Sequence, residues 1–400
     1  MKIETLASLK NTEDLNDGNF NDSEYLCGVI YAATTYGVSR WHVSNGTVLK
    51  DNSDFEWQCK AEALNQWNGN LIMICDYEFI MLNPKTNKAT RVPLVLPMKN
   101  LLSQTVKTNI LNREIVIREH EHPPHIWNKT LVVGDELYIL MQYSETNIQD
   151  KNFKTIRKTE RYSVVCVYDL PSLSLKKHYV LTFQSNEGTA FTFAVNKPFL
   201  YYNHGGDGEI CRINIDNGQT ETFSLNRGGN QCTGLATDKD YVYAFYGNDR
   251  DDWCVCVLNA AGHIKTIDLS GQIAGFNASM IGEHEKLLSK LGLMYMRDED
   301  FKQHYGDVYN DIAIAGFRRA VNGNEPYFCA MDADICTDFG YIAIATELGP
   351  APAFIWSIKT EAPVCYLFGT RETVVSRKIK VRHPYIISTA FEHLHLWRIV

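Results

Sequence analysis

Strand-like runs, in which apolar and polar residues tend to alternate, recur along the whole chain. The segment NGNLIMICDYEFIML (68–82) contains two such runs, and HLHLWRIV (393–400) forms another. A period of two in hydrophobicity is typical of β-strands that bury one face. Asn-Gly, Asn-Pro, Asp-Asn-Gly and Ala-Gly sequences stand between runs, where hairpins require tight turns. Long helical periodicity is absent from most of the chain, so the pattern predicts an all-β protein.

One unit of this pattern repeats. It consists of an alternating strand, a large apolar residue followed by a polar residue, a short turn and a second strand. The large apolar anchors are Trp41, Leu82, Tyr168, Ile213, Leu258, Trp356 and Trp397. Four of the six spacings between them are 41 or 45 residues, the period of a four-stranded propeller blade. The other two, 86 and 98 residues, are either one period plus an insertion or two periods with a weak blade inside.

The strands RWHV, VYDL, FIWSI and LWRIV resemble those of WD40-like seven-bladed β-propellers. The glycine-histidine pair that precedes each blade in that family is missing, and its tryptophan-aspartate pair survives only as RWH, VYD or IWS. The resemblance therefore implies a divergent propeller with seven blades, in one domain over residues 1–400. It also implies a role in binding other proteins, by analogy at the level of the fold.

The seventh unit ends after its third strand, which leaves a four-stranded blade without its outer strand. An open strand edge favours aggregation, so we expect another segment to pair with it. MKIETLASL (1–9) is the one unassigned strand candidate near a terminus. We predict that it lies beside HLHLWRIV and closes the ring. The competing prediction is an eighth blade inside 97–127 or 281–330.

The first insertion contains residues 144–161, which we expect to form a basic loop. It carries Lys151, Lys154, Arg157, Lys158 and Arg161 against Glu145, Asp150 and Glu160. One interpretation is a solvated extension of a hairpin. The other is a contact for a protein partner with an acidic surface, with anionic lipid headgroups as a further candidate. For this contact we select Lys154, Arg157 and Lys158.

The second insertion, 281–325, has a helical pattern. Phe301, Tyr305, Val308, Tyr309, Ile312, Ala315 and Gly316 recur at the spacing of one helical face. Asn322-Gly323 is a suitable stop signal. Such an element either seals a junction between blades or offers a surface to a partner. Because aromatic residues and arginines dominate binding hot spots, we predict partner contacts at Tyr305, Tyr309, Phe317, Arg318 and Arg319.

Composition and charge narrow the classes of function. The net charge is −8 and the pI about 5.9, whereas nucleic-acid binders are usually basic. No apolar run reaches the length of a membrane span, and the N-terminal sequence has no secretory pattern. The eleven cysteines have apolar flanks and form no C-x-x-C pair, which is typical of free thiols in a reducing compartment. We therefore predict a cytoplasmic monomer.

Chemical motifs are sparse. His120, His122 and His125 have a spacing that could hold a metal ion, but two prolines separate the third from the others. YNHGGDGE (202–209) and GNDRDDW (247–253) supply possible acid or base groups, but their glycine, asparagine and aspartate residues are also ordinary turn residues. We predict no cofactor and a non-catalytic interaction platform, a scaffold or adaptor. The alternative is a hydrolase or lyase with a pore-centred site, with or without the assistance of a metal ion.

Overall fold

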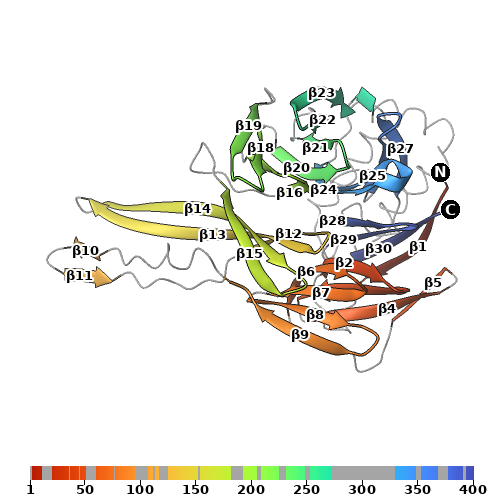
Figure 1. The fold of residues 1–400 in the computed structure, drawn as a ribbon, viewed down its shortest axis with the longest axis horizontal. Coiled ribbons are helices and arrows are strands. Elements are labelled where there is room, and N and C mark those ends of the chain that lie inside the picture. Colours follow the sequence, from red (N-terminus) through yellow and green to blue (C-terminus); the bar gives the residue numbers. More distant parts are fainter. Residues whose placement is uncertain are drawn as a thin grey trace, which may run out of the picture.

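The protein is described here by a computed structural model (Figure 1). It describes residues 2–10, 20–35, 37–44, 46–50, 60–75, 77–95, 107–110, 113–116, 125–151, 154–181, 192–204, 209–224, 231–247, 253–269, 271–272, 329–347, 353–367, 377–390 and 393–400. In a few of these ranges, among them 143–151 and 154–162, only the backbone is described.

Seven antiparallel sheets of four strands form the bulk of the structure. Blade 1 contains β2 (Phe20–Leu26), β3 (Val29–Thr34), β4 (Val38–Ser44) and β5 (Thr47–Lys50). Blade 2 contains β6 (Ala61–Trp67), β7 (Asn70–Cys75), β8 (Glu78–Asn83) and β9 (Lys88–Pro93). Blade 3 contains β12 (His125–Val133), β13 (Glu136–Lys151), β14 (Lys154–Asp169) and β15 (Ser174–Leu181).

The remaining four blades follow the same order in the chain. Blade 4 contains β16 (Phe193–Asn196), β17 (Phe199–His204), β18 (Glu209–Asn214) and β19 (Thr220–Ser224). Blade 5 contains β20 (Gln231–Thr237), β21 (Val242–Gly247), β22 (Cys254–Asn259) and β23 (Gly262–Asp268). Blade 6 contains β24 (Cys329–Cys336), a 3₁₀ turn at Thr337–Phe339, β25 (Tyr341–Glu347), β26 (Ala353–Ser357) and β27 (Ala362–Leu367). Blade 7 contains β28 (Lys378–Arg382), β29 (Tyr385–Ala390), β30 (His393–Ile399) and β1 (Ile3–Lys10).

The first strand of each blade lines a common axis. In the order β2, β6, β12, β16, β20, β24, β28 and back to β2, each first strand contacts the next, which closes a ring. Each of the seven predicted anchors lies in the third strand of a different blade. The seven-bladed β-propeller predicted from the repeat is therefore confirmed.

The predicted closure by the N-terminal segment is also confirmed. Strand β1 pairs antiparallel with β30, from Ile3 opposite Ile399 to Lys10 opposite His393. Figure 1 shows the two chain ends side by side on the same blade. The edge of β30 thus has a partner strand, and the last blade has the same four strands as the others.

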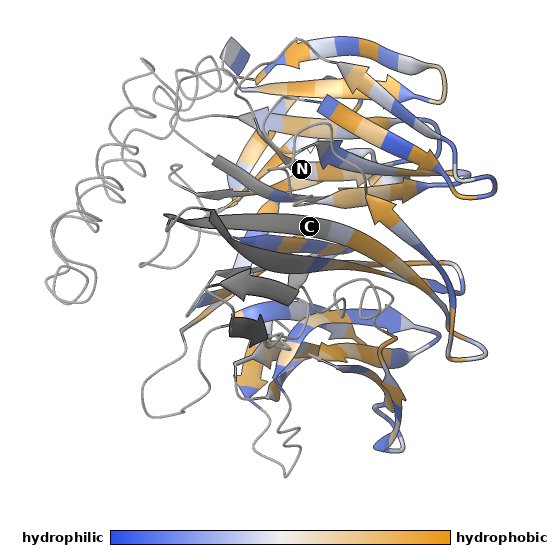
Figure 2. Cartoon of the chain, turned by 90° about the vertical axis from the view of Figure 1, so that its left-hand side faces the viewer, coloured by the Kyte–Doolittle hydropathy of each residue, from blue (hydrophilic) through white to orange (hydrophobic). Residues whose placement is uncertain are grey.

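The core lies between blades. Each of the seven hydrophobic clusters combines side chains from two neighbouring blades. Trp356 and Trp397 are fully buried and Trp41 is nearly so, as the sequence predicts for anchors between blades. Inner strands such as β7 and β22 are buried at nearly every position, whereas outer strands such as β9 and β23 are mostly exposed. Each blade therefore buries both faces of its inner strands, and hydrophilic residues gather along its outer parts (Figure 2).

The two faces of the ring differ in their connections. On one, which we call the turn face, a blade's first strand joins its second and its third joins its fourth. These links are short, as at Asn68-Gly69, where both residues have positive φ, of 46° and 75°. Such a turn matches the twist of the flanking strands and favours Asn-Gly. On the other, which we call the insertion face, the second strand joins the third and each blade joins the next.

Both interruptions of the period begin and end on the insertion face. Residues 144–161, predicted as a loop, instead continue β13 and β14 as a paired hairpin from Glu136 opposite Asp169 to Lys151 opposite Lys154. Of the two interpretations of this segment, the structure therefore agrees with an extension of a hairpin. Within 97–127, a candidate for an eighth blade, the described residues include only a separate two-stranded hairpin of β10 (Lys107–Ile110) and β11 (Arg113–Val116), together with the first residues of β12. Residues 281–325 lie outside the described residues, so their helix stays a prediction.

Candidate interaction face

The predicted contact residues all belong to segments that begin and end on the insertion face. Tyr305, Tyr309, Phe317, Arg318 and Arg319 lie outside the described residues, between the end of β23 at Asp268 and the start of β24 at Cys329. Those two ends are on the insertion face, because the link from blade 5 to blade 6 emerges there. The hairpin β13–β14 connects a second strand to a third, so it projects from the same face. The topology therefore places the two ends of the link from blade 5 to blade 6 and the root of the hairpin on one side of the ring.

The hairpin carries the second predicted contact. Its backbone pairs place Lys154 opposite Lys151, Arg157 opposite Ile148 and Lys158 opposite Asn147. Figure 1 shows β13 and β14 extending well beyond the rest of blade 3. Lys154, Arg157 and Lys158 thus lie on the far part of the hairpin, away from the body of the ring.

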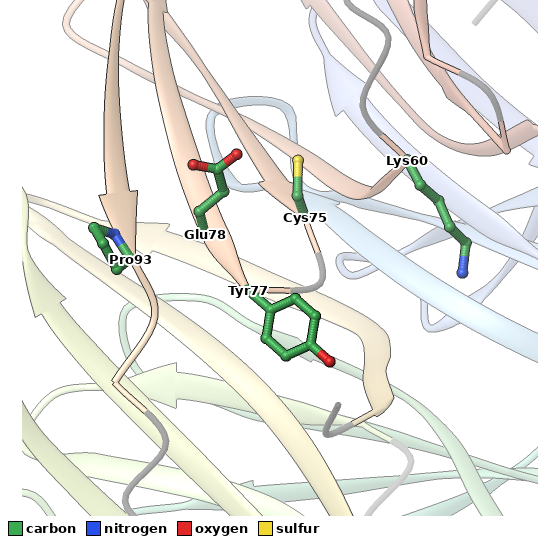
Figure 3. Close-up of a pocket in the computed structure, with 5 residues that line it drawn as sticks. All are labelled: Lys60, Cys75, Tyr77, Glu78 and Pro93. Atoms are coloured by element: carbon green, nitrogen blue, oxygen red, sulfur yellow. The ribbon is translucent and has the colours of Figure 1, made fainter. Parts of the chain in front are cut away.

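An open hollow lies on the insertion face at blade 2 (Figure 3). Lys60, Cys75, Tyr77, Glu78 and Pro93 line it. Cys75 and Glu78 point to the same side from neighbouring strands, whereas the Tyr77 ring turns away from them. Tyr77 is 54% exposed, and Glu78 forms an ion pair with Arg91. With one exposed ring and a carboxylate that is already paired, this hollow offers a minor contact surface.

Beneath the insertion face, charged residues of the first strands fill the pore. Several of them accept backbone N–H groups from the following blade. Asp22 accepts from Leu64 at 2.8 Å, and Asp334 accepts from Val381 at 2.8 Å. Asp332 accepts from Ile379 at 3.2 Å. These carboxylates therefore join neighbouring first strands that are not paired in a common sheet.

The cations of the pore bridge blades, including blades that are not neighbours. Arg382 of β28 donates two hydrogen bonds to the Glu24 carboxylate of β2, at 2.5 and 2.7 Å. Lys380 donates to Asp22 at 2.7 Å and also to the Leu64 carbonyl of blade 2. Lys129 of blade 3 reaches Asp332 of blade 6 at 2.7 Å. These side chains cross the pore and connect its walls.

Electrostatics of the pore follow from burial and these pairs. Burial opposes ionisation of Asp22, but the charges of Lys380 and Lys378 and the Leu64 N–H outweigh it, so the pKa of Asp22 lies below its usual value. Burial likewise opposes the charge on Lys129, but Asp332 raises the pKa of that lysine. Burial dominates at Asp334 and raises its pKa. At Lys378, burial also dominates and lowers the pKa.

Comparison with known proteins gives structural matches alone. No family model and no curated protein sequence matches the chain. The virginiamycin B lyase of Staphylococcus aureus superposes over 100% of both chains, with a TM-score of 0.55 and 8% identity. The Pan2 WD40 domain of Neurospora crassa covers 99% of this chain and 95% of its own, with a TM-score of 0.52 and 7% identity. A chain of a mitotic checkpoint complex matches over 100% of this chain and 91% of its own, with a TM-score of 0.51 and 10% identity.

The fold is that of a WD40-like seven-bladed β-propeller. At such low identities the likeness extends to the fold alone. Solved propellers of this shape include a lyase as well as a WD40 domain, so the architecture is compatible with catalysis and with binding. The function has to be argued from the propeller's own residues.

Of the predicted acid, base and metal candidates, the structure describes three, His125, His204 and Glu209, and all three stand at strand ends on the insertion face. His204 ends β17 and Glu209 begins β18, as expected of a link between second and third strands. Asp207, Asp249, Asp251 and Asp252, together with His120 and His122, lie outside the described residues, and His125 is the first residue of β12. Within the described part of the chain, no three His, Cys, Asp or Glu side chains are placed to hold a metal ion. There is likewise no helix, in that part, long and apolar enough to cross a membrane.

Sequence reasoning missed the charged pore. Its signal is a charge at every second position of a first strand, as in KIKVR (378–382) and DAD (332–334). An alternation of charged and apolar residues usually marks a solvated face. In the propeller, the first strands of all seven blades surround the axis, and the charges of β2, β6, β12, β24 and β28 meet there, so they are mostly buried.

Proposed function

We propose that the chain is a non-catalytic protein-interaction platform whose partner binds the insertion face. The proposal is supported by where the long departures from the blade repeat leave the described strands: their flanking strand ends all lie on one face. Links on the turn face are short, whereas the link from blade 5 to blade 6 and the hairpin β13–β14 emerge on the other side. A rigid scaffold that concentrates its additional segments on one face is typical of proteins that bind through loops.

The pore groups support binding over catalysis. Asp22, Asp332 and Asp334 accept backbone N–H groups and Glu24 pairs with Arg382, so these acids already serve contacts between blades. A general acid or base needs access to a substrate proton. Since these carboxylates are engaged within the wall of the ring, they favour a binding role over the pore-centred hydrolase or lyase.

The partner contacts that we propose are those of the two insertions. Tyr305, Tyr309, Phe317, Arg318 and Arg319 form the first contact, and Lys154, Arg157 and Lys158 form a second contact for an acidic surface. A protein partner fits because aromatic and arginine side chains supply most hot-spot energy in protein interfaces. Arg318 and Arg319 are the cleaner probes, since part of the aromatic face of a docked helix has to pack on the ring. Scaffold or adaptor activity in the cytoplasm, by a monomer, stays a prediction.

The test uses the full chain as bait in a lysate and quantifies captured proteins. Arg318→Ala with Arg319→Ala should weaken capture of a partner at least tenfold while leaving the melting temperature unchanged. Lys85→Ala with Lys88→Ala removes two exposed charges from the turn face at blade 2 and serves as the matched control. A variant that shortens the hairpin by removing 144–161 examines the second contact. Undiminished capture by both insertion-face variants would disprove the proposal.

A further inference from the structure

The distal part of hairpin β13–β14 has two strand edges that no described strand covers. Strand β12 follows β13 only as far as His125 opposite Gln142. Strand β15 follows β14 only as far as Leu181 opposite Ser163. Beyond these points, among the described strands, residues 143–151 and 154–162 pair only with each other. A strand edge of this kind presents N–H and C=O groups that can accept a further strand.

The two edges differ in charge. Residues 154–162 of β14 contain Lys154, Arg157, Lys158 and Arg161 against the single acid Glu160, and residues 143–151 of β13 contain Glu145 and Asp150 against Lys151. The β14 edge is therefore strongly cationic, on a chain whose net charge is −8. Residues 143–151 of β13 carry more acids than bases, whereas residues 154–162 of β14 carry more bases than acids. An acidic segment is therefore attracted to the β14 edge and not to the β13 edge.

We propose that residues 154–162 of β14 bind an extended acidic segment of a partner protein by strand addition. Backbone hydrogen bonds along the edge would supply affinity, and the four cations would select acidic residues on the added strand. A stretch of this length spans roughly 30 Å, enough for several carboxylates. The inference rests on the proposed platform function and names the chemistry of its second contact.

The same charges disfavour a second copy of the chain. Two β14 edges laid side by side would place cations against cations, and like charges opposite one another destabilise a strand pair. Lysines on an exposed edge are a common protection against such self-pairing. An acidic strand placed on this edge is attracted and not repelled. The edge therefore favours an acidic partner strand over the β14 edge of a second copy.

The direct test uses a labelled ten-residue peptide of alternating threonine and glutamate with the full chain. We expect saturable binding in fluorescence anisotropy that weakens as salt increases. A second peptide of identical sequence carries N-methyl groups on alternate backbone nitrogens, which keeps every charge but blocks strand pairing along one edge. It should bind about tenfold more weakly, because several backbone hydrogen bonds are lost. Amide hydrogen exchange should slow within 154–162 when the unmethylated peptide is bound.

Charge variants separate this edge from general attraction. Lys154→Gln with Lys158→Gln should weaken the peptide at least fivefold, whereas Lys85→Gln with Lys88→Gln on the turn face should change binding less than twofold. The melting temperature of both variants is measured alongside, so that a folding defect is recognised.

Three results would overturn strand addition. Equal binding of the methylated peptide would show attraction by charge without pairing. Binding of vesicles that contain phosphatidylserine, with no slowed exchange on adding peptide, would identify the hairpin as a lipid contact. Concentration-dependent dimers in sedimentation, with slowed exchange in 154–162, would identify a second copy as the occupant. If the peptide does not bind, but Arg318→Ala with Arg319→Ala still abolishes capture of a partner, the platform function holds and strand addition at this edge is wrong. If the peptide binds but the arginine variant captures the partner normally, strand addition holds and the contact at Arg318 and Arg319 is wrong.

Discussion

Lys129 and Asp332 join two blades that are not neighbours in the ring. The Lys129 ammonium of β12 lies 2.7 Å from a carboxylate oxygen of Asp332 in β24, and the same ammonium contacts the Ala333 carbonyl at 3.3 Å. Both side chains are nearly buried, at 12% and 13% exposure. The pair also connects the two blades at which the repeat is interrupted: β12 is the first strand of blade 3, which carries the hairpin β13–β14, and β24 is the first strand after the second interruption.

Removing one member of this pair should destabilise the ring strongly. Lys129→Met leaves Asp332 charged and largely buried, which typically costs about 3–5 kcal/mol. Lys265→Met provides a control, since Lys265 pairs with Glu361 at the surface, where such pairs contribute about 1 kcal/mol or less. Urea unfolding of both variants measures the difference. Equal free energies of unfolding for the two variants would contradict the structural role of the pore pair.

The strand that closes the ring should be required for a soluble fold. Deleting residues 1–9 removes most of β1 and exposes the edge of β30, along with the cluster on which Leu6 and Leu9 pack. We expect a large drop in melting temperature and association of the truncated chain, visible by light scattering. A truncated protein that melts like the full chain and stays unassociated would mean that β1 contributes little to closure.

The tryptophan anchors should contribute much more than a tryptophan at the ring surface. Trp397 is fully buried in the junction of blades 6 and 7, so Trp397→Ala should lower the free energy of unfolding by about 3–5 kcal/mol. Trp67 is only partly buried and donates a hydrogen bond from Nε1 to Asp135 at 2.9 Å. Trp67→Ala should therefore cost clearly less. Chemical unfolding compares the two, and a similar loss in both would argue against the anchor role.

The repeat made the fold predictable from sequence. Anchors such as Trp41 and Trp356 recur at the period of a blade because the third strand of every blade faces the same packing problem. The open edge of HLHLWRIV predicted its partner, since an unpaired terminal strand is unfavourable. Both inferences use local patterns that physics ties closely to strand pairing.

The pore and the hairpin were harder to predict for different reasons. Lys378 and Lys380 alternate with apolar residues just as a solvated strand face does, and only the closed ring turns that face inward. Residues 144–161 lack a hydrophobic face, because a ribbon that projects from the ring has no core to pack against. Their pairing therefore left no periodic signal, and the polar composition suggested a loop.

His395 links the stability of the last blade to pH. Its imidazole is buried in β30 and stacks on Trp397, with 5.4 Å between ring centroids. Burial, with a smaller contribution from His393, lowers the pKa of His395 from 6.5 to about 3. The unfolded chain therefore takes up a proton near pH 6.5, whereas the folded chain does so only near pH 3. Because the unfolded state binds the additional proton, stability is lost as the pH falls between these two values.

We expect this one group to remove about 2 kcal/mol of stability between pH 7.5 and pH 5. His395→Phe keeps a planar ring for stacking on Trp397 and removes the titration, while the carboxylates that titrate in the same range remain in both proteins. Urea unfolding at several pH values gives two curves, and their difference isolates the histidine. Relative to the unaltered protein, the variant should be about 2 kcal/mol more stable at pH 5 than it is at pH 7.5. Parallel curves would show that His395 takes up its proton at the same pH in the folded and unfolded states, and hence that its surroundings are not those of a buried, neutral ring.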